Sequence, residues 1–160
     1  MKLFNLFNSL YDEDILSKLD FLLHIRLFEG IKKRSLIHVL ENLQERTYLK
    51  GETIFTQGDI GRALFLVFSG KVALSRLDPS TQKSSTVAEV NPGEFFGEMA
   101  LLEEMPRTAT ASALEETRVF ILFKIKLESL LFARPKIGVV IASQLAKIMS
   151  ARLRAIIDKA

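Results

Sequence analysis

Apolar residues change their spacing along this chain, and the first section has the spacing of helices. From about Ile15 to Leu43 apolar side chains recur every three or four residues, and acidic residues stand in the opening turn at Asp12–Asp14. This spacing gives a helix one apolar face, and acidic side chains favour its first turn. The sequence therefore predicts two or more helices here, with a break near Glu29-Gly30.

Turn residues interrupt the middle section, residues 47–124, at short intervals. Gly58-Asp59, Asp78-Pro79-Ser80 and Asn91-Pro92-Gly93 separate runs that are rich in Val, Phe, Leu and Thr. Short runs of this kind between turns are typical of a compact antiparallel sandwich or barrel. The expected strands are Thr53–Thr56, Ala63–Ser69, Lys71–Leu77, Ser84–Val90, Thr108–Ala113 and Thr117–Phe123.

Helical spacing returns at Leu127 and continues, after Arg134-Pro135, from Val139 to Ile157. The pattern predicts an α+β fold in which helices bracket an antiparallel sandwich. We find no internal repeat and no linker. We therefore expect residues 1–160 to form a single domain, with N-terminal helices (1–46), a β section (47–124) and C-terminal helices (125–160).

Composition narrows the classes of function. The chain has 160 residues, no cysteine and a formal charge of +3, with 22 Lys and Arg against 19 Asp and Glu. The lack of cysteine excludes disulfide frameworks, thiolate catalysis and cysteine-bound metal, and it fits a cytoplasmic protein. The basic excess is too small and too dispersed to indicate a nucleic-acid partner. We interpret the basic residues of the tail, 134–160, as the solvated face of a helix.

No stretch is long and apolar enough to span a bilayer, so we expect no transmembrane segment. Polar residues from Asn8 onward interrupt the apolar start of the chain, which excludes a signal-peptide core. Leu3, Phe4, Phe7 and Leu10 nevertheless recur at helical spacing. This end could lie on a membrane surface or on a partner, and we expect it to pack on its own domain.

One interval, residues 91–110, breaks the strand pattern and is interpreted as strand, turn, short helix, loop and strand. Gly97 removes side-chain bulk where the short helix begins, so the amides of Met99 and Ala100 could face an anion at close range. Pro106 is expected to end this helix and to fix the approach to Arg107, whose planar guanidinium can donate to two phosphate oxygens. These residues predict a cradle of the size of a phosphate.

Glu98 stands at the head of the same short helix. Its carboxylate could accept a hydrogen bond from a sugar hydroxyl, as acidic side chains do with ribose in dinucleotide sites. A sugar and a phosphate together indicate a nucleotide. The alternative is a structural ion pair between Glu98 and Arg107 with no ligand at all.

The stretch from Phe96 to Leu102, followed by Pro106-Arg107-Thr108-Ala109-Thr110, resembles the phosphate-binding cassette of cyclic nucleotide-binding domains. Catabolite activator proteins, regulatory subunits of protein kinase A and cyclic-nucleotide-gated channels share this family. The resemblance covers roughly residues 12–158 and implies a jelly-roll sandwich (a double-stranded β-helix) with N-terminal helices and a long C-terminal helix. Other similar segments are Leu27–Gly30, Tyr48–Asp59 and Phe65–Gly70.

The resemblance implies a ligand, cyclic AMP or cyclic GMP, and no cofactor or metal. Arg107 would pair with the cyclic phosphate, Glu98 would accept the ribose 2′-hydroxyl, and amides near Ala100 and Thr108 would complete the cradle. A threonine directly after the arginine occurs in relatives selective for cyclic GMP, whereas many cyclic-AMP binders have Ala or Ser there. We still expect cyclic AMP, because it is the commoner ligand of stand-alone family members.

The resemblance also places residues around the base. Buried strands need the same apolar types for core packing, so that reading stays open for the strand positions. Arg152 in the last helix would lie near the base with Ser150 and Leu153, or else be a solvated charge. The strand positions that line the family's base pocket are Leu74, Val87 and Ala88.

The last helix would act as a lid over the ligand. Its apolar seam at three-and-four spacing could instead join two copies into a homodimer, as in activator-type transcription factors. The seam consists of Leu145, Met149, Leu153 and Ile156.

We expect a ligand-operated module and not an enzyme. His24 and His38 are the chain's two histidines, and neither a Gly-x-Ser-x-Gly elbow nor a Walker loop occurs. Direct DNA binding of the activator type would need a helix-turn-helix after the long helix, so we expect no nucleic-acid contact and a separate effector protein. Two functions remain open: a cyclic-nucleotide sensor, and a constitutive scaffold with an empty cassette.

Overall fold

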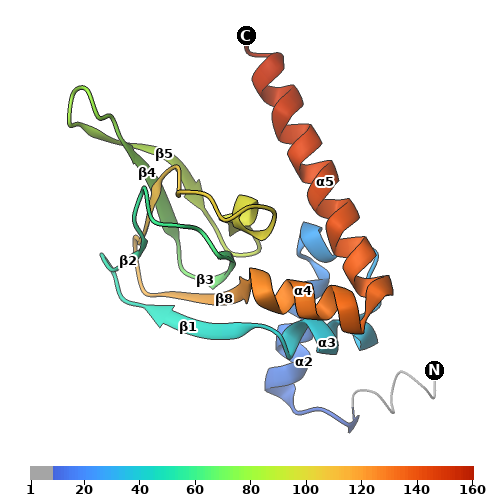
Figure 1. Cartoon of the computed structure of the whole chain (residues 1–160). Coiled ribbons are helices and arrows are strands. Elements are labelled where there is room, and N and C mark those ends of the chain that lie inside the picture. The colour runs from blue at the N-terminus through green and yellow to red at the C-terminus, as the bar shows by residue number, and fades with distance from the viewer. Residues whose placement is uncertain (1–8) are drawn as a thin grey trace. The chain divides into compact units, whose positions relative to one another are not determined.

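The computed structural model describes residues 9–160 (Figure 1). The expectation for Leu3, Phe4 and Phe7 therefore lies outside the described residues. The chain divides into two compact units. One joins the residues up to Asn42 with Glu128–Ala160, and the other is Leu43–Leu127. The expectation of one domain over the whole chain stays a prediction.

The unit Leu43–Leu127 is a sandwich of two four-stranded antiparallel sheets, ordered β1-β8-β3-β6 and β2-β7-β4-β5 (Figure 1). The predicted antiparallel sandwich, and with the helices the α+β class, are confirmed. The strands are β1 (Gln44–Tyr48), β2 (Thr53–Phe55), β3 (Ala63–Ser69), β4 (Val72–Leu77), β5 (Ser84–Val90), β6 (Phe95–Phe96), β7 (Thr110–Ala113) and β8 (Thr117–Phe123).

Alternating apolar side chains of both sheets form the core of this unit. In the first sheet Phe65 pairs with Ile121 and Val67 pairs with Val119, and all four are buried. Val72 in the second sheet belongs to the same cluster. Successive side chains of a strand point to opposite faces, so residues two apart share the inner face of a sandwich. Removing this surface from water stabilises the sheets by about 25 cal/mol per Å².

β1 was not among the strands expected, and β6 was expected only as the strand that opens the interval 91–110. In β1 only Tyr48 is buried, so the sequence has no run of apolar residues from which this strand could be predicted. β6 is two residues long, Phe95–Phe96. The strand expected over Thr108–Ala113 begins at Thr110, because the loop before it bonds elsewhere: the N–H of Gly58 donates to Arg107 O at 2.9 Å.

Helices make up the other unit, and α4 crosses from one unit into the other. The N–H of Ile15 donates to the carboxylate of Asp12 at 2.8 Å, which caps α2. Pro135 opens α5, where its missing N–H costs nothing. The elements are α2 (Glu13–Leu23), η1 (Arg26–Phe28), η2 (Lys33–Ser35), α3 (Leu36–Leu40), α4 (Lys124–Ala133) and α5 (Pro135–Ile157).

The break in the first helical section is wider than expected, because α2 ends at Leu23 and short 3₁₀ turns follow it. Gln144 on α5 donates through Nε2 to Glu29 O at 3.0 Å, which ties α5 to the end of η1. A Cβ on Gly138 would lie 2.3 Å from Cδ2 of Leu131, so glycine lets α5 and α4 pack closely. The helices expected on either side of Arg134-Pro135 are confirmed.

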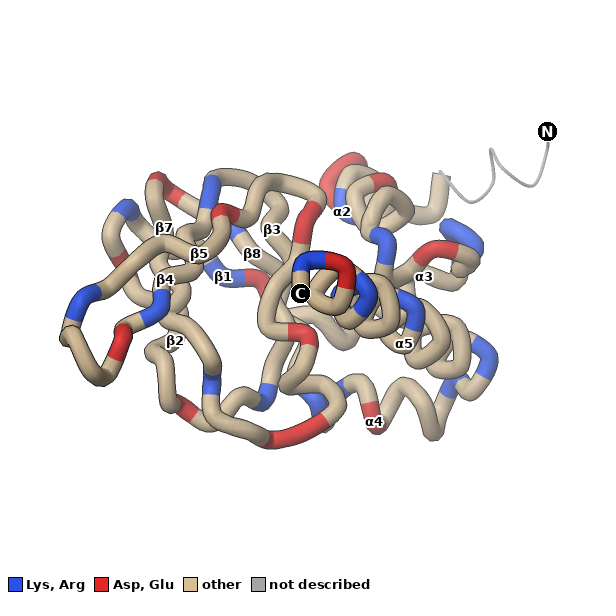
Figure 2. The backbone as a smooth tube through the Cα atoms, turned by 90° about the horizontal axis from the view of Figure 1, so that it is seen from above, with Lys and Arg blue, Asp and Glu red and all other residues tan. Residues whose placement is uncertain are grey.

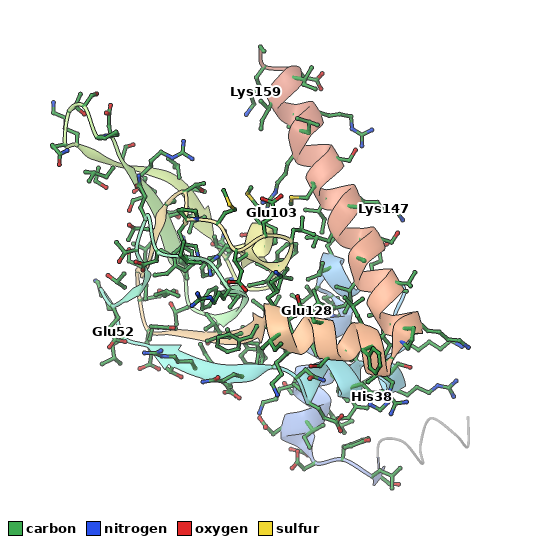
Figure 3. All side chains as sticks on the ribbon, viewed as in Figure 1. His38, Glu52, Glu103, Glu128, Lys147 and Lys159 are labelled. Atoms are coloured by element: carbon green, nitrogen blue, oxygen red, sulfur yellow. The ribbon has the colours of Figure 1, made fainter. Side chains whose placement is uncertain are left out.

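Lys and Arg residues are distributed along α5 (Figure 2). Lys147 extends from this helix and Lys159 lies just beyond its end (Figure 3), and both are exposed. The interpretation of the basic tail as a solvated helix face agrees with these positions. Within residues 9–160, no helix combines the length and the apolar character that a bilayer crossing requires.

Candidate functional site

The predicted cassette begins with a left-handed glycine. After β6, Gly97 adopts φ +76° and leads into η3 (Glu98–Leu101), a single 3₁₀ turn. A Cβ on Gly97 would lie 2.7 Å from Nη1 of Arg107 and 3.2 Å from Ala63 O. There are therefore two reasons for glycine at this position: the left-handed backbone conformation, and the space that the arginine side chain occupies.

Arg107 is bonded on both its side chain and its backbone. Nη2 donates to Ala63 O at 2.7 Å, and Nη1 donates to Gly97 O at 3.3 Å. The N–H of Arg107 donates to Asp59 O at 2.7 Å, and Arg107 O accepts from the N–H of Gly58 at 2.9 Å. The β2–β3 loop, β3 and the cassette thus fix one guanidinium between them.

Two aromatic rings lie against this guanidinium, and a third ring packs on both of them. Cζ of Arg107 is 4.1 Å from the ring centroid of Phe55 and 5.7 Å from that of Phe65. The Phe55 ring is 5.5 Å from Phe65 and 5.8 Å from Phe96, and Phe65 stacks on Phe96 at 5.2 Å. A cation within about 6 Å of a ring face is attracted by the ring quadrupole.

Burial lowers the pKa of the Arg107 guanidinium below its ordinary value, and the negative charge of Asp59 acts in the opposite direction. The group stays charged at neutral pH, because an arginine titrates far above it. The Asp59 carboxylate also accepts from the N–H of Thr56 at 2.9 Å, which shapes the β2–β3 loop. The cassette therefore presents a fixed, half-buried positive charge.

Glu98 is the most buried acidic residue of the site, with 2% of its surface exposed. It follows Gly97 directly, and the Gly97 carbonyl accepts from Nη1 of Arg107, so the guanidinium is bonded to the residue next to Glu98. Glu98 interacts with other residues of the chain. A buried carboxylate needs such partners, because burying an unpaired charge is costly.

The cassette amides differ in part from the expected arrangement. The N–H of Ala100 donates to Gly97 O at 3.2 Å inside η3, and Met99 is 61% exposed. The expectation that Pro106 ends the helix is wrong: η3 ends at Leu101, and Pro106 forms an isolated β-bridge with Ile60. The 3₁₀ turn is limited by its own geometry, since i→i+3 bonding rarely continues beyond four residues.

The predicted base-pocket residues lie on the β4–β5 hairpin. Leu74 pairs directly with Ala88, so both lie on the same sheet face, and Leu74 packs against the core cluster. A register shift after Leu74 coincides with Val87, which is 50% exposed. Thr108 is exposed, and its carbonyl accepts from Nε of Arg76 at 3.2 Å.

Arg152 belongs to the helical unit. Burial lowers its pKa, and the nearby positive charge of Arg26 lowers it further. The α5 seam divides: Leu145 is buried, whereas Leu153 and Ile156 are 59% and 67% exposed. The structure thus brings together the cassette residues and, on the hairpin, Leu74, Val87 and Ala88.

Sequence reasoning missed several residues of this site. Phe55, Asp59 and Ala63 contact or bond Arg107 but lie more than forty positions before it. Ala63 acts through its backbone carbonyl, which no sequence pattern reports. Phe55 looks like any apolar strand residue, so only the fold shows that its ring faces a cation.

No group of three or more His, Cys, Asp or Glu side chains in the described part of the chain could hold a metal ion. Nδ1 of His24 lies 2.7 Å from Asp20 O, and His38 is half-buried beside Glu41, with 3.5 Å between Nδ1 and Oε2. Both contacts lie within helical segments of the same unit.

A family model described as the cyclic nucleotide-binding domain matches residues 45–134, more than half of the chain. The chain belongs to this family. The matched residues include all of β2 to β8, and with them the cassette that holds Glu98 and Arg107. The resemblance stated from the sequence is confirmed.

Curated relatives include the cyclic AMP receptor protein of Thermus thermophilus, which is 41% identical over 128 residues, 80% of this chain and 57% of that protein. A cAMP-dependent protein kinase regulatory subunit of Dictyostelium discoideum is 36% identical over 66% of this chain and 31% of the subunit. The chain thus spans little more than half of the Thermus protein, and less of the kinase subunit.

Among solved structures, this cyclic nucleotide-binding domain is similar to the catabolite activator protein of Thermus thermophilus, with a TM-score of 0.76 and 39% identity over 84% of this chain and 61% of that one. A cyclic nucleotide-binding domain from Methylobacillus flagellatus has a TM-score of 0.78 and 26% identity over 92% of this chain and 82% of that one. These likenesses confirm the predicted sandwich with a long C-terminal helix.

Proposed function

We propose that this chain is a sensor that binds a cyclic nucleotide in the cassette 96–110, cyclic AMP in preference to cyclic GMP, and acts in the cytoplasm as a regulator and not as an enzyme. The observation that carries the proposal is the fixed guanidinium of Arg107, which is bonded to the carbonyl of Gly97, the residue directly before the buried Glu98. A phosphate and a ribose hydroxyl are the groups that this pair suits.

The guanidinium keeps donors for a ligand. An arginine has five N–H groups, and the two bonds to Ala63 O and Gly97 O use two of them. The others can donate to the equatorial oxygens of a cyclic phosphate. Gly97 is bonded to the guanidinium, and Thr108 follows Arg107 in the chain, so backbone amides near them could also donate to the phosphate. Glu98 would accept the ribose 2′-hydroxyl.

Cyclic AMP is favoured because relatives at 41% and 36% identity are named for it, as a cyclic AMP receptor protein and a cAMP-dependent kinase subunit. Leu74, Val87 and Ala88 would line the base, and the base contact expected for Arg152 stays a prediction. Thr108 is the position at which cyclic GMP could gain an additional hydrogen bond.

Calorimetric titration with cyclic AMP and cyclic GMP tests this function. We expect wild type to bind and Arg107→Ala to lose at least tenfold in affinity, because a charge-assisted hydrogen bond contributes ~1.5–3 kcal/mol. Arg46→Ala is the matched control, since Arg46 also lies over a ring, 4.6 Å from the Tyr48 centroid, but on β1. Equal affinities of wild type and Arg107→Ala would overturn the cassette assignment.

Because Arg107 also supports the fold through its own bonds, Arg107→Lys is the second variant. Lysine keeps the charge and loses the planar fork, so it should retain the unfolding temperature better than alanine and still bind more weakly than wild type. If Arg107→Lys is folded and binds the nucleotide as tightly as wild type, the planar guanidinium is not needed to bind the phosphate.

We further propose that the bound nucleotide signals through α5. Leu153, Ile156 and Ile157 are 59%, 67% and 61% exposed at the end of this helix. Such a surface could cover the base, contact a separate effector protein or join a second copy, and ligand that prefers one arrangement shifts the population toward it. We do not expect these residues to contact nucleic acid directly.

A second candidate is a constitutive scaffold whose cassette stays empty. The bonds from Arg107 to the Ala63 and Gly97 carbonyls favour it, because they give the arginine a structural role without any ligand. The same titration separates the two functions. A wild-type chain that binds neither nucleotide supports the scaffold.

A further inference from the structure

The Phe55 ring lies closer to the Arg107 guanidinium than the neighbouring Phe65 ring does. Phe55 ends β2, is half-buried and has its ring centroid 4.1 Å from Cζ of Arg107. Phe65, which lies deeper in the core with 7% of its surface exposed, is 5.7 Å from the same atom. Of these two rings, Phe55 is the one that lies directly against the cation.

Two glycines close the remaining sides of the guanidinium. A Cβ on Gly61 would lie 3.0 Å from both Cζ and Nε of Arg107, and a Cβ on Gly97 would lie 2.7 Å from Nη1. With the carbonyls of Ala63 and Gly97 these groups form what we call the guanidinium cage: the Phe55 ring, Gly61, Ala63 O and Gly97. The cage leaves the arginine little freedom to change its rotamer.

We propose that Phe55 is a positioning residue for nucleotide binding, and that its ring holds the Arg107 guanidinium in the orientation that meets the phosphate. This inference rests on the proposed function of the cassette. The carbonyls fix two nitrogens of the guanidinium, whereas the ring lies against its central carbon. Both restraints are needed to orient a planar fork in three dimensions.

The physical reason is preorganisation. Arginine has a long side chain with many rotamers, and ordering it on binding reduces affinity. A ring face that already holds the cation in the ligand-free chain removes part of that cost. The attraction is stronger here than on the surface, because burial has removed water from the guanidinium.

The ring also leaves the donors of the guanidinium accessible. A phenyl ring has no lone-pair acceptor, so it attracts the cation through its quadrupole and forms no conventional hydrogen bond with the N–H groups. Phe55 can therefore restrain Arg107 without competing with a phosphate for hydrogen bonds. A carboxylate in the same place would hold the arginine as firmly but would repel the ligand.

The experiment compares Phe55→Leu with Phe65→Leu in the full chain, by calorimetry with cyclic AMP and by thermal unfolding. Leucine keeps most of the apolar volume and removes the ring. We expect Phe55→Leu to weaken binding about tenfold, equivalent to ~1.4 kcal/mol, and Phe65→Leu to weaken it less than threefold. Phe65→Leu should lower the unfolding temperature at least as much, because it lies deeper in the core.

A second readout needs no ligand. The Nε–H resonance of Arg107 in a ¹⁵N spectrum should carry a ring-current shift that Phe55→Leu removes and Phe65→Leu largely keeps. If Phe55→Leu does not fold, Phe55→Met replaces it, since methionine fills irregular apolar space.

The outcomes are distinguishable. A wild type that binds while Phe55→Leu binds equally well, or loses no more than Phe65→Leu, overturns the inference and leaves the proposed function intact. A wild type that binds neither nucleotide overturns the proposed function, and the inference with it. Weaker binding by Phe55→Leu alone, together with the lost ring-current shift, supports the positioning role.

Discussion

At the scale of single residues, the site is a set of restraints on one side chain. Groups from β2, the β2–β3 loop, β3 and the cassette meet at the Arg107 guanidinium. Two backbone carbonyls compensate for its lost hydration, and the Phe55 ring adds an attraction that is independent of hydrogen bonding. The arginine is thus stably placed before any ligand arrives.

Gly61 provides a prediction at this scale. Its backbone lies outside the left-handed region, so an alanine there meets no conformational strain, yet its Cβ would lie 3.0 Å from Nε of Arg107 and from the Ala100 Cβ. We expect Gly61→Ala to displace the guanidinium and weaken cyclic-AMP binding several-fold, as titration calorimetry would show.

The control for this variant is its own thermal unfolding. The atoms that must move are mainly the end of a side chain that is kept, so the unfolding temperature should fall less than in Arg107→Ala. A large drop in the unfolding temperature together with unchanged affinity would contradict the cage as described.

Part of the residue-scale picture could be predicted from the sequence. Gly97, Glu98 and Arg107 lie within one short segment of the sequence. The resemblance of that segment to the family's cassette was therefore enough to identify all three. Phe55, Gly61 and the carbonyl of Ala63 reach Arg107 only because β2 and β3 fold beside the cassette. Contacts of that kind depend on the register of strands far apart in the chain, which periodicity does not determine.

At the scale of elements, turn residues predicted most strands, and the exceptions have physical causes. β1 exposes every residue except Tyr48, so it lacks an apolar signal and is held by pairing with β8. β6 is too short for any periodicity. α5 was predicted as one long helix, but its seam divides into buried Leu145 and exposed Leu153 and Ile156, which spacing alone did not show.

The divided seam leads to a prediction for α5. If nucleotide binding changes the contacts of this helix, hydrogen–deuterium exchange of residues 138–158 should slow when cyclic AMP is added, most strongly in the turns that contain Leu153 and Ile156. The exchange of α2 (Glu13–Leu23) is the internal comparison and should not change.

Slower exchange confined to residues 96–110 would contradict the signalling role of α5 and leave binding itself unaffected. Slower exchange of α2 and α5 together, by equal factors, would indicate a general stabilisation by ligand and not a specific response of the helix.

At the scale of the whole molecule, the chain combines a β sandwich that carries the cassette with a helical unit that carries the exposed end of α5. Relatives named as receptors and regulatory subunits use a domain of this family within longer chains. Any coupling of ligand to output must therefore pass from the sandwich unit to groups outside it. Binding of a cyclic nucleotide at Arg107 must come before that coupling.

The most direct test is an NMR titration of the ¹⁵N-labelled wild type with cyclic AMP. It follows the amides of residues 97–108 and the Nε–H of Arg107, with the β1 amides of Gln44–Tyr48 as reference. We predict saturable shifts that are largest at Gly97, Glu98 and Arg107 and small along β1. No saturable shift, or a saturable shift that leaves the Arg107 Nε–H in place, would contradict this account.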